Sequence, residues 1–161
     1  MSAFTIRDAR WPEDREAAAG FIDGLQRFEH DFEPNRRVDP LAGIEYLDVL
    51  LDAATKKEGI VRIAEADGRA VGWTVAYPEA DSLFVVPEER RFVYIAELYV
   101  AEGLRGTGIG RALIAVCEDW ARANGFRILK IGAHADNTRA AETYKRAGYA
   151  PYALQLRKYI A

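Results

Sequence analysis

The chain has 161 residues, of which 50% are hydrophobic and 29% charged, and it carries a formal net charge of -3 with a pI near 5.5. This length predicts one domain, residues 1–161, with enough chain to bury a core. The slightly acidic balance argues against general nucleic-acid binding, because such binding relies on a basic face that neutralises phosphates.

The sequence also predicts neither a membrane segment nor a metal centre. Met1–Glu16 is charged and lacks the apolar core of a signal peptide, and no apolar run approaches the length of a bilayer. We therefore expect a cytoplasmic protein with no membrane partner. Cys117 is the lone cysteine, which excludes an internal disulfide, and with the scattered His30 and His134 it does not make a metal site.

Three elements are predicted in the first third of the chain. Phe4–Arg7 alternates like a strand, and Pro12 predicts the start of a long helix because proline is favoured at the first helical position. That helix is expected from Glu13 to Phe32, with an apolar stripe that faces inward. A second apolar helix is expected from Pro40 to Lys57, and Gly59 ends it.

The rest of the chain predicts a mixed sheet. Strands at Ile60–Glu65 and Val71–Tyr77 are joined at Asp67-Gly68, which supplies the positive φ angles of an antiparallel hairpin. Two later apolar strands are linked by one helix and should therefore lie parallel. The later elements are expected at Ser82–Val86 (extended), Phe92–Val100 (strand), a helix ending at Asn124, Arg127–Ala133 (strand), Thr138–Ala147 (helix) and Tyr152–Tyr159 (a last strand).

A glycine-rich turn, Leu104-Arg105-Gly106-Thr107-Gly108-Ile109-Gly110-Arg111, joins the predicted strand Phe92–Val100 to an amphipathic helix. Helix N-termini leave amide N–H groups without internal partners, and glycines let those groups crowd around a phosphate, so the turn is a candidate anion site. It lacks the Gly-Lys-Ser/Thr of a P-loop, and Arg111 stands where the third glycine of a dinucleotide-binding turn would fall. The alternative is a plain tight turn.

The remaining pattern, Arg105-x-x-Gly108-x-Gly110 after Leu98-Tyr99-Val100, resembles the GNAT superfamily of acyl-CoA-dependent N-acyltransferases. The pyrophosphate loop of that family reads Gln/Arg-x-x-Gly-x-Gly/Ala. A second block is similar as well: Asn137 opens a helix, Tyr144 follows two turns later, and Gly148-Tyr149 comes next. The resemblance is strong over Phe92–Tyr152 and covers the N-terminal half only in the order of its elements.

The resemblance implies an α/β (α+β) fold of one domain, with a central mixed, mostly antiparallel sheet, helices on both faces and a splayed parallel strand pair. It also implies acetyl-CoA as the cofactor, with the pantetheine arm added in the splay like another strand. Asn137 would bond the cofactor, although it also suits a helix N-cap. The implied cofactor-binding residues are Leu98, Tyr99, Val100, Arg105, Gly106, Thr107, Gly108, Ile109, Gly110, Asn137 and Tyr144.

Amine acetylation needs a base, because an alkylamine with a pKa of about 10.4 is protonated at neutral pH and cannot attack a thioester until it loses that proton. Glu97 is the only carboxylate inside Phe92–Val100, and we predict it as the base. The resemblance implies that Tyr144 is the acid that protonates the departing thiolate. Many members of the family carry two acidic residues here, whereas this chain has Ala96-Glu97. The alternatives are a structural salt-bridge partner for Glu97 and a core residue for Tyr144.

The resemblance implies that the first helices wall the acceptor site. The carboxylates of Glu29, Asp31 and Glu33 there would suit a cationic amine, although acidic residues on a helix are also commonly just solvated. The predicted function is N-acetyl transfer from acetyl-CoA directly to a primary amine of a small molecule, peptide or protein. The alternative is a catalytically inactive acyl-CoA-binding sensor or interaction module. Glu97 and Tyr144 favour the enzyme, since a binder needs neither. A homodimer is kept open.

Overall fold

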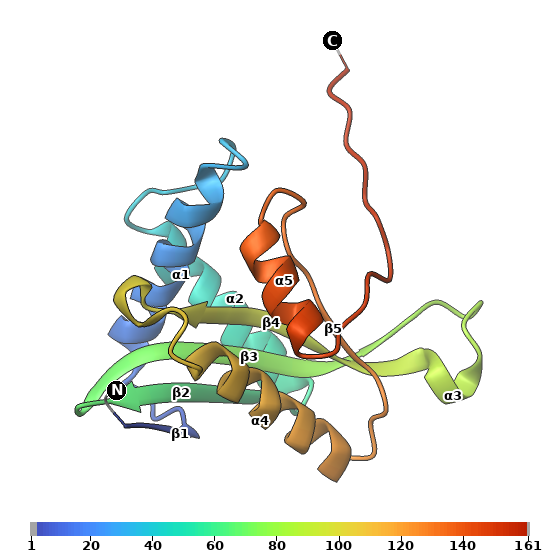
Figure 1. Ribbon diagram of the computed structural model, residues 1–161, viewed down its shortest axis with the longest axis horizontal. Helices are drawn as coiled ribbons and strands as arrows, with labels where there is room; N and C mark the ends of the chain where they lie inside the picture. The colour runs from blue at the N-terminus through green and yellow to red at the C-terminus, as the bar shows by residue number, and fades with distance from the viewer. Residues whose placement is uncertain (1–2, 161) are drawn as a thin grey trace.

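The computed structural model of the chain describes residues 3–160, and its centre is a five-stranded sheet in the order β1-β2-β3-β4-β5 (Figure 1). The strands are β1 (Phe4–Asp8), β2 (Ile60–Ala66), β3 (Arg69–Ala80), β4 (Arg91–Val100) and β5 (Leu129–Ile131). Every neighbouring pair is antiparallel except β4 and β5, which are parallel. The prediction of a mixed, mostly antiparallel sheet is confirmed.

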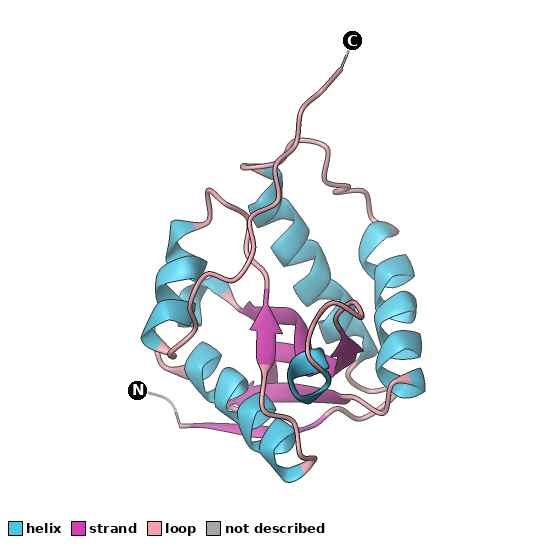
Figure 2. Ribbon diagram, turned by 90° about the vertical axis from the view of Figure 1, so that its right-hand side faces the viewer, coloured by secondary structure: helices cyan, strands magenta, loops and turns pink. Residues whose placement is uncertain are grey.

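Helices cover both faces of this sheet, as expected (Figure 2). The helices are α1 (Arg15–His30), α2 (Ala42–Lys56), α3 (Pro87–Arg90), α4 (Ile109–Ala123) and α5 (Thr138–Arg146), with a short 3-10 turn η1 (Glu102–Leu104) after β4. The helices α1 and α2 pack on one face, and α4 packs on the other.

Two apolar layers hold the sheet in place. The layer under α1 and α2 contains Ile22, Leu47, Ile63, Trp73 and Val75, all almost completely buried. The layer under α4 contains Val93, Ile95, Ile109, Leu113 and Cys117. Each large side chain that leaves water in this way stabilises the fold by about 1.5 to 3 kcal/mol. The central strands β3 and β4 are therefore fixed from both sides.

The predicted hairpin is confirmed, with β2 and β3 joined by Asp67 at φ 49° and Gly68 at φ 71°. The predicted start of the first helix is wrong. Pro12 lies in a turn before the helix, and Asp14 takes the cap position. The Asp14 carboxylate accepts two hydrogen bonds from the Arg7 guanidinium, at 2.7 and 2.9 Å, and this tie to β1 sets where the helix begins.

Three predicted stretches in the second half of the chain differ from the structure. Residues 82–86 form a turn, not an extended piece, and β5 covers only the middle of the predicted strand at 127–133. The predicted last strand, Tyr152–Tyr159, is absent: residues 147–160 run without regular structure away from the sheet (Figure 1). A strand needs a partner edge, and this tail is instead tied to the body by side chains, Tyr152 to Lys130 and Arg157 to Glu33.

Candidate active site

A β-bulge in β4 sets the direction of the predicted base. Val75 of β3 pairs with Glu97, whereas the next residue, Ala76, pairs with Ile95, so Ala96 is an extra residue without a partner on β3. Bulges of this kind bend a strand and redirect the side chains that follow. Glu97 is the first residue after the inserted one.

The bulge changes which residues face which helix layer. Val93 and Ile95, before it, pack on the α4 side, and so do Leu98 and Val100 after it. In an unbroken strand alternate residues share a face, which would have placed Glu97 with Val93 and Ile95. The inserted residue instead places Glu97 on the face covered by α1 and α2, opposite Val75.

The burial of the Glu97 carboxyl group favours its protonated state. The side chain is only 5% exposed, and its Oε2 atom has no hydrogen-bond partner within residues 3–160. Burial, together with the nearby charge of Glu29, raises the pKa of Glu97 to about 8, and the charge of Arg36 opposes the shift. A carboxyl group with a pKa near 8 is poised to exchange a proton near neutral pH.

Tyr144 of α5 lies within electrostatic reach of this carboxyl group. Burial raises the pKa of Tyr144 to about 12, and the charges of Glu29 and Glu97 add to the shift. The phenol is therefore protonated at neutral pH and can donate. The structure thus brings together α5, β4 and the end of α1, three segments far apart in the sequence.

The predicted acceptor carboxylates lie at the end of α1 and differ in their surroundings. Arg36 binds Glu29 at 3.2 Å and Glu33 at 2.8 Å, and Glu33 also pairs with Arg157 of the C-terminal tail. Asp31 is exposed. The charge of Glu29 acts on Glu97, so this end of α1 faces the buried carboxyl group.

The glycine turn after η1 offers unpaired backbone donors. Gly106 has a φ of 85° and Gly108 a φ of 97°, and a Cβ atom at either would meet nothing within 4 Å. Within the described chain no acceptor takes the N–H groups of Gly106, Thr107 and Gly108. Ile109 and Gly110 open α4, where the first N–H groups have no partner in the helix. The arrangement fits a phosphate group.

The Arg105 side chain connects the glycine turn to β4 and to α1. Its Nε donates to the Val100 carbonyl at 3.1 Å, and its guanidinium lies over the rings of Phe28 and Tyr99, 5.0 and 5.6 Å from their centroids. Tyr99 also stacks on Phe21 of α1, with 5.5 Å between centroids. Arg105 and Tyr99 therefore fix the turn against α1.

The end of β4 has a free edge between the turn and Glu97. Pairing with β5 stops at Ile95, so the parallel pair splays as expected. Ala101 donates its N–H to the Val71 carbonyl of β3 at 2.8 Å, and by the alternation of an antiparallel pair the backbone groups of Leu98 and Val100 face away from β3. These groups face the splay, where the Val100 carbonyl already accepts from Arg105, while the side chains of both residues pack in the core, as predicted.

Asn137 caps α5, because its Oδ1 accepts the N–H of Ala140 at 3.1 Å. The side chain is 9% exposed, and nothing in residues 3–160 accepts from its Nδ2. The alternative of a helix N-cap is thus confirmed for the Oδ1 atom of Asn137. The two N–H donors of its Nδ2 group have no acceptor in the described chain.

Two side chains near Glu97 were not predicted from the sequence. Arg36 joins Glu29 and Glu33, a pairing that the spacing of three residues between Glu33 and Arg36 would have suggested. Tyr46 of α2 also lies near: burial raises its pKa to about 12, and the charge of Glu97 adds to this. No sequence pattern marked Tyr46.

Among residues 3–160, no helix is long and apolar enough to cross a membrane, and no group of three or more His, Cys, Asp and Glu side chains is placed to hold a metal ion.

The family comparison agrees with this geometry. Residues 13–149 match the model of the acetyltransferase (GNAT) family. The uncharacterized N-acetyltransferase YhfO of Bacillus subtilis (strain 168) is 29% identical over 115 residues, which cover 71% of this chain and 72% of the relative. A mycothiol acetyltransferase of Geodermatophilus obscurus is 36% identical over 141 residues, which cover 78% of this chain but only 44% of that relative.

Solved structures share the fold. A mutant of the BH1408 protein of Bacillus halodurans superposes with a TM-score of 0.82 at 19% identity, covering 98% of this chain and 99% of that chain. The aminoglycoside N-acetyltransferase AAC(6')-Iy, solved in complex with CoA, superposes with a TM-score of 0.67 at 21% identity, covering 98% and 96% of the two chains.

Proposed function

Because the chain belongs to the acetyltransferase (GNAT) family, we propose that it transfers an acetyl group from acetyl-CoA directly to a primary amine of a small molecule, a peptide or a protein. One observation carries the proposal. A buried, unpartnered carboxyl group, Glu97, lies within electrostatic reach of the Tyr144 phenol, beside a strand edge that leads to the glycine turn.

The residues of the site suit acetyl-CoA as the acetyl donor. The free N–H groups of residues 106–110 are placed to neutralise a diphosphate. The outward backbone groups of Leu98 and the N–H group of Val100 are placed to bond an extended amide chain. The Nδ2 group of Asn137 is a further donor. Acetyl-CoA supplies an activated thioester whose carbonyl an amine attacks.

Glu97 is proposed to prepare the acceptor. Its carboxylate takes a proton from the incoming ammonium group, and a pKa near 8 lies between that of an ordinary carboxyl group and that of an alkylamine. Glu29 and Glu33 add negative charge at the end of α1 for a cationic acceptor, with Asp31 at the exposed rim. The guanidinium of Arg36 neutralises part of the negative charge of Glu29 and Glu33.

Tyr144 is proposed to complete the reaction. Its phenol gives a proton to the departing thiolate, while the outward N–H group of Leu98 bonds the oxyanion that forms at the carbonyl. The amine attacks the carbonyl directly, so no acyl-enzyme forms. We also propose that residues 1–161 act as one domain.

The comparisons do not favour the alternative of an inactive acyl-CoA-binding module, since the relatives are named as N-acetyltransferases. The deciding experiment incubates the purified chain with acetyl-CoA and a panel of primary amines and follows the free thiol. We expect thiol release that depends on an amine and falls at least about tenfold in Glu97→Gln, with Glu142→Gln, an exposed carboxylate on α5, as the control. CoA binding without turnover on any amine would support the inactive module.

A further inference from the structure

Thr74 of β3 places a hydroxyl group in the apolar layer under α4. Its side chain is 0% exposed and lies next to Cys117 of α4. A buried hydroxyl group costs free energy unless it has a hydrogen-bond partner, and a valine of similar shape would fill the same space without that cost. A role beyond packing is therefore expected for this hydroxyl group.

The Thr74 hydroxyl group donates to the main chain of the neighbouring strand β4. Its Oγ1 lies 2.8 Å from the carbonyl oxygen of Glu97, and the bond is buried. The Sγ of Cys117 lies 3.5 Å from the same Oγ1. Because a hydroxyl group has one hydrogen, which the Glu97 carbonyl takes, the thiol is the donor in this second bond. Burial raises the pKa of Cys117 to about 11, so the thiol keeps its proton at neutral pH.

The carbonyl oxygen that accepts from Thr74 belongs to the peptide unit between Glu97 and Leu98. This peptide unit is trans, because the one cis peptide bond of residues 3–160 is Trp11-Pro12. In a planar trans peptide the C=O and N–H groups point in opposite directions. Since the C=O group is held toward β3, the N–H group of Leu98 points away from β3.

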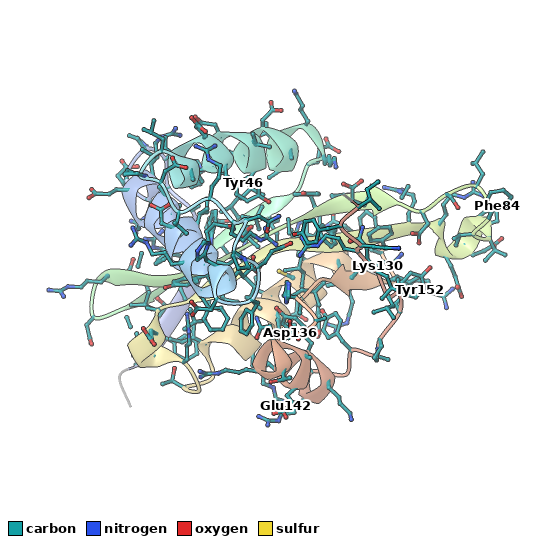
Figure 3. The ribbon with its side chains drawn as sticks, turned by 90° about the horizontal axis from the view of Figure 1, so that it is seen from above. Tyr46, Phe84, Lys130, Asp136, Glu142 and Tyr152 are labelled. Carbon is teal, nitrogen blue, oxygen red and sulfur yellow. The ribbon has the colours of Figure 1, made fainter. Side chains whose placement is uncertain are left out.

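The direction away from β3 leads to the proposed reaction centre. The strand β4 lies between β3 and β5, and its pairing with β5 stops at Ile95, so the Leu98 N–H group points into the splay on the β5 side. The helix α5 follows β5, and Figure 3 shows Glu142 of α5 across the middle strands from Tyr46 of α2. This N–H group is the proposed donor to the oxyanion.

The β-bulge explains why a side chain is needed to hold this peptide unit. The register of β3 and β4 shifts between Val75 and Ala76, so Ala96, immediately before Glu97, has no partner on β3. A bulge disrupts the ladder of main-chain hydrogen bonds at its own position. Thr74 is directly opposite Leu98, the second residue after the inserted one. Its hydroxyl group thus adds a bond where the ladder resumes.

We propose that Thr74 is a positioning residue for the proposed acetyl transfer. Its hydroxyl group fixes the plane of the peptide unit between Glu97 and Leu98, so that the Leu98 N–H group is directed at the oxyanion that forms when the amine attacks the thioester. A hydrogen bond to a carbonyl group also polarises its peptide unit, which makes the N–H group a stronger donor. This role rests on the proposed function, since without acetyl transfer there is no oxyanion to stabilise.

Thr74→Val removes the hydroxyl group and keeps a branched side chain that suits a strand. Removing an oxyanion donor outright costs about 100-fold to 1,000-fold in kcat. Thr74→Val leaves the Leu98 donor in place but without its anchor, so we expect kcat to fall by a smaller factor, about tenfold. KM for the amine and Kd for CoA should stay within about twofold, because an interaction made only in the transition state does not contribute to ground-state binding.

The experiment measures kcat and KM with a primary amine that the parent accepts, and Kd for CoA by calorimetry. Thr74→Ser keeps the hydroxyl group and should hold kcat within about threefold of the parent. Two controls separate the loss of the hydroxyl group from a loss of stability. Thr5→Val makes the same exchange at an exposed position of β1, and Ile63→Val removes a buried methylene group from β2. Both should keep kcat within about twofold of the parent.

A second readout needs no turnover. In carbon-13 NMR the carbonyl resonance of Glu97 should move upfield in Thr74→Val and stay in place in Thr74→Ser, because a carbonyl carbon is shielded when it loses a hydrogen bond. A Glu97 resonance that does not move in Thr74→Val means that the bond is absent in solution, and the proposal is then wrong.

The kinetic outcomes distinguish the role of Thr74 from the function on which it rests. A parent that releases no thiol with any amine refutes acetyl transfer, and the role of Thr74 with it. With an active parent, three results refute the role of Thr74 alone: an unchanged kcat in Thr74→Val, a lowered kcat that Thr74→Ser shares, or a change confined to KM.

Discussion

Replacing Glu97 by Gln should remove a large, pH-dependent destabilisation of the folded chain. Burial raises the pKa of Glu97 from 4.5 to about 8, so between these values the folded state holds a proton that the unfolded state has lost. The unfolded state then binds fewer protons, and the free energy of unfolding falls as the pH rises through this window. Below pH 4.5 and above about pH 8, Glu97 adds nothing to the slope of the unfolding free energy against pH.

The magnitude follows from the same two values. The gap between 4.5 and about 8 corresponds to about 5 kcal/mol at about 1.36 kcal/mol per pKa unit. This figure is an upper bound, because an ionised side chain gains water when its surroundings relax. Between about pH 5.5 and pH 8.5 we expect the parent to lose roughly 2 to 3 kcal/mol from this group, a large part of an ordinary stability of about 5 to 15 kcal/mol.

The assay is urea unfolding followed by circular dichroism at several values of pH. Glu97→Gln should show a flatter dependence than the parent, while Glu142→Gln, whose side chain is 67% exposed, should keep the slope of the parent. The other titratable groups are common to the three proteins, so their contributions cancel in the comparison. Equal slopes for the parent and Glu97→Gln would refute the buried, protonated Glu97 on which the catalytic proposal depends.

Three further predictions concern the donor site, the acid and the fold. Gly110→Asp places a carboxylate in the first turn of α4, which helices tolerate well, and should weaken CoA binding at least about tenfold by calorimetry, whereas Ala115→Asp on the exposed side of α4 should not. Tyr144→Phe should keep CoA affinity within about twofold but lower the turnover number about tenfold or more; an unchanged rate would remove the phenol from the mechanism. Asp14→Asn, which removes one of the two carboxylates that pair with the Arg7 guanidinium, should lower the free energy of unfolding at neutral pH by about 1 to 3 kcal/mol in urea titrations, and a loss below about 0.5 kcal/mol would count against a structural role.

The positions of the middle elements could be predicted because their signals are local. Asp67-Gly68 marks a hairpin by its own backbone preferences, and the run from Phe92 to Val100 is apolar enough to be a central strand. The glycine turn likewise carries its own evidence, since positive φ angles at Gly106 and Gly108 are what glycine permits.

The features that could not be predicted from the sequence depend on contacts between residues that lie far apart in the chain. The facing of Glu97 is set by a mismatch between β3 and β4, which no pattern within β4 reveals. The tail alternates like a strand, yet alternation alone provides no edge to pair with, and residues 147–160 are held by Lys130 and Glu33 instead. Arg36 and Tyr46 reach Glu97 only because α1 and α2 cover the same face of the sheet.

The extra residue in β4 makes the facing of a reactive group depend on how two strands pair and not on side-chain chemistry. A natural variant that lacked Ala96 would pair β4 with β3 without a bulge, and Glu97, now directly after Ile95, would still face α1 and α2 and not the apolar layer beside α4. Exchanging Ala96 for another small residue would leave the spacing intact. Both changes should therefore keep Glu97 on its present face, whereas a β4 that retained Ala96 but lost the bulge would turn Glu97 toward α4.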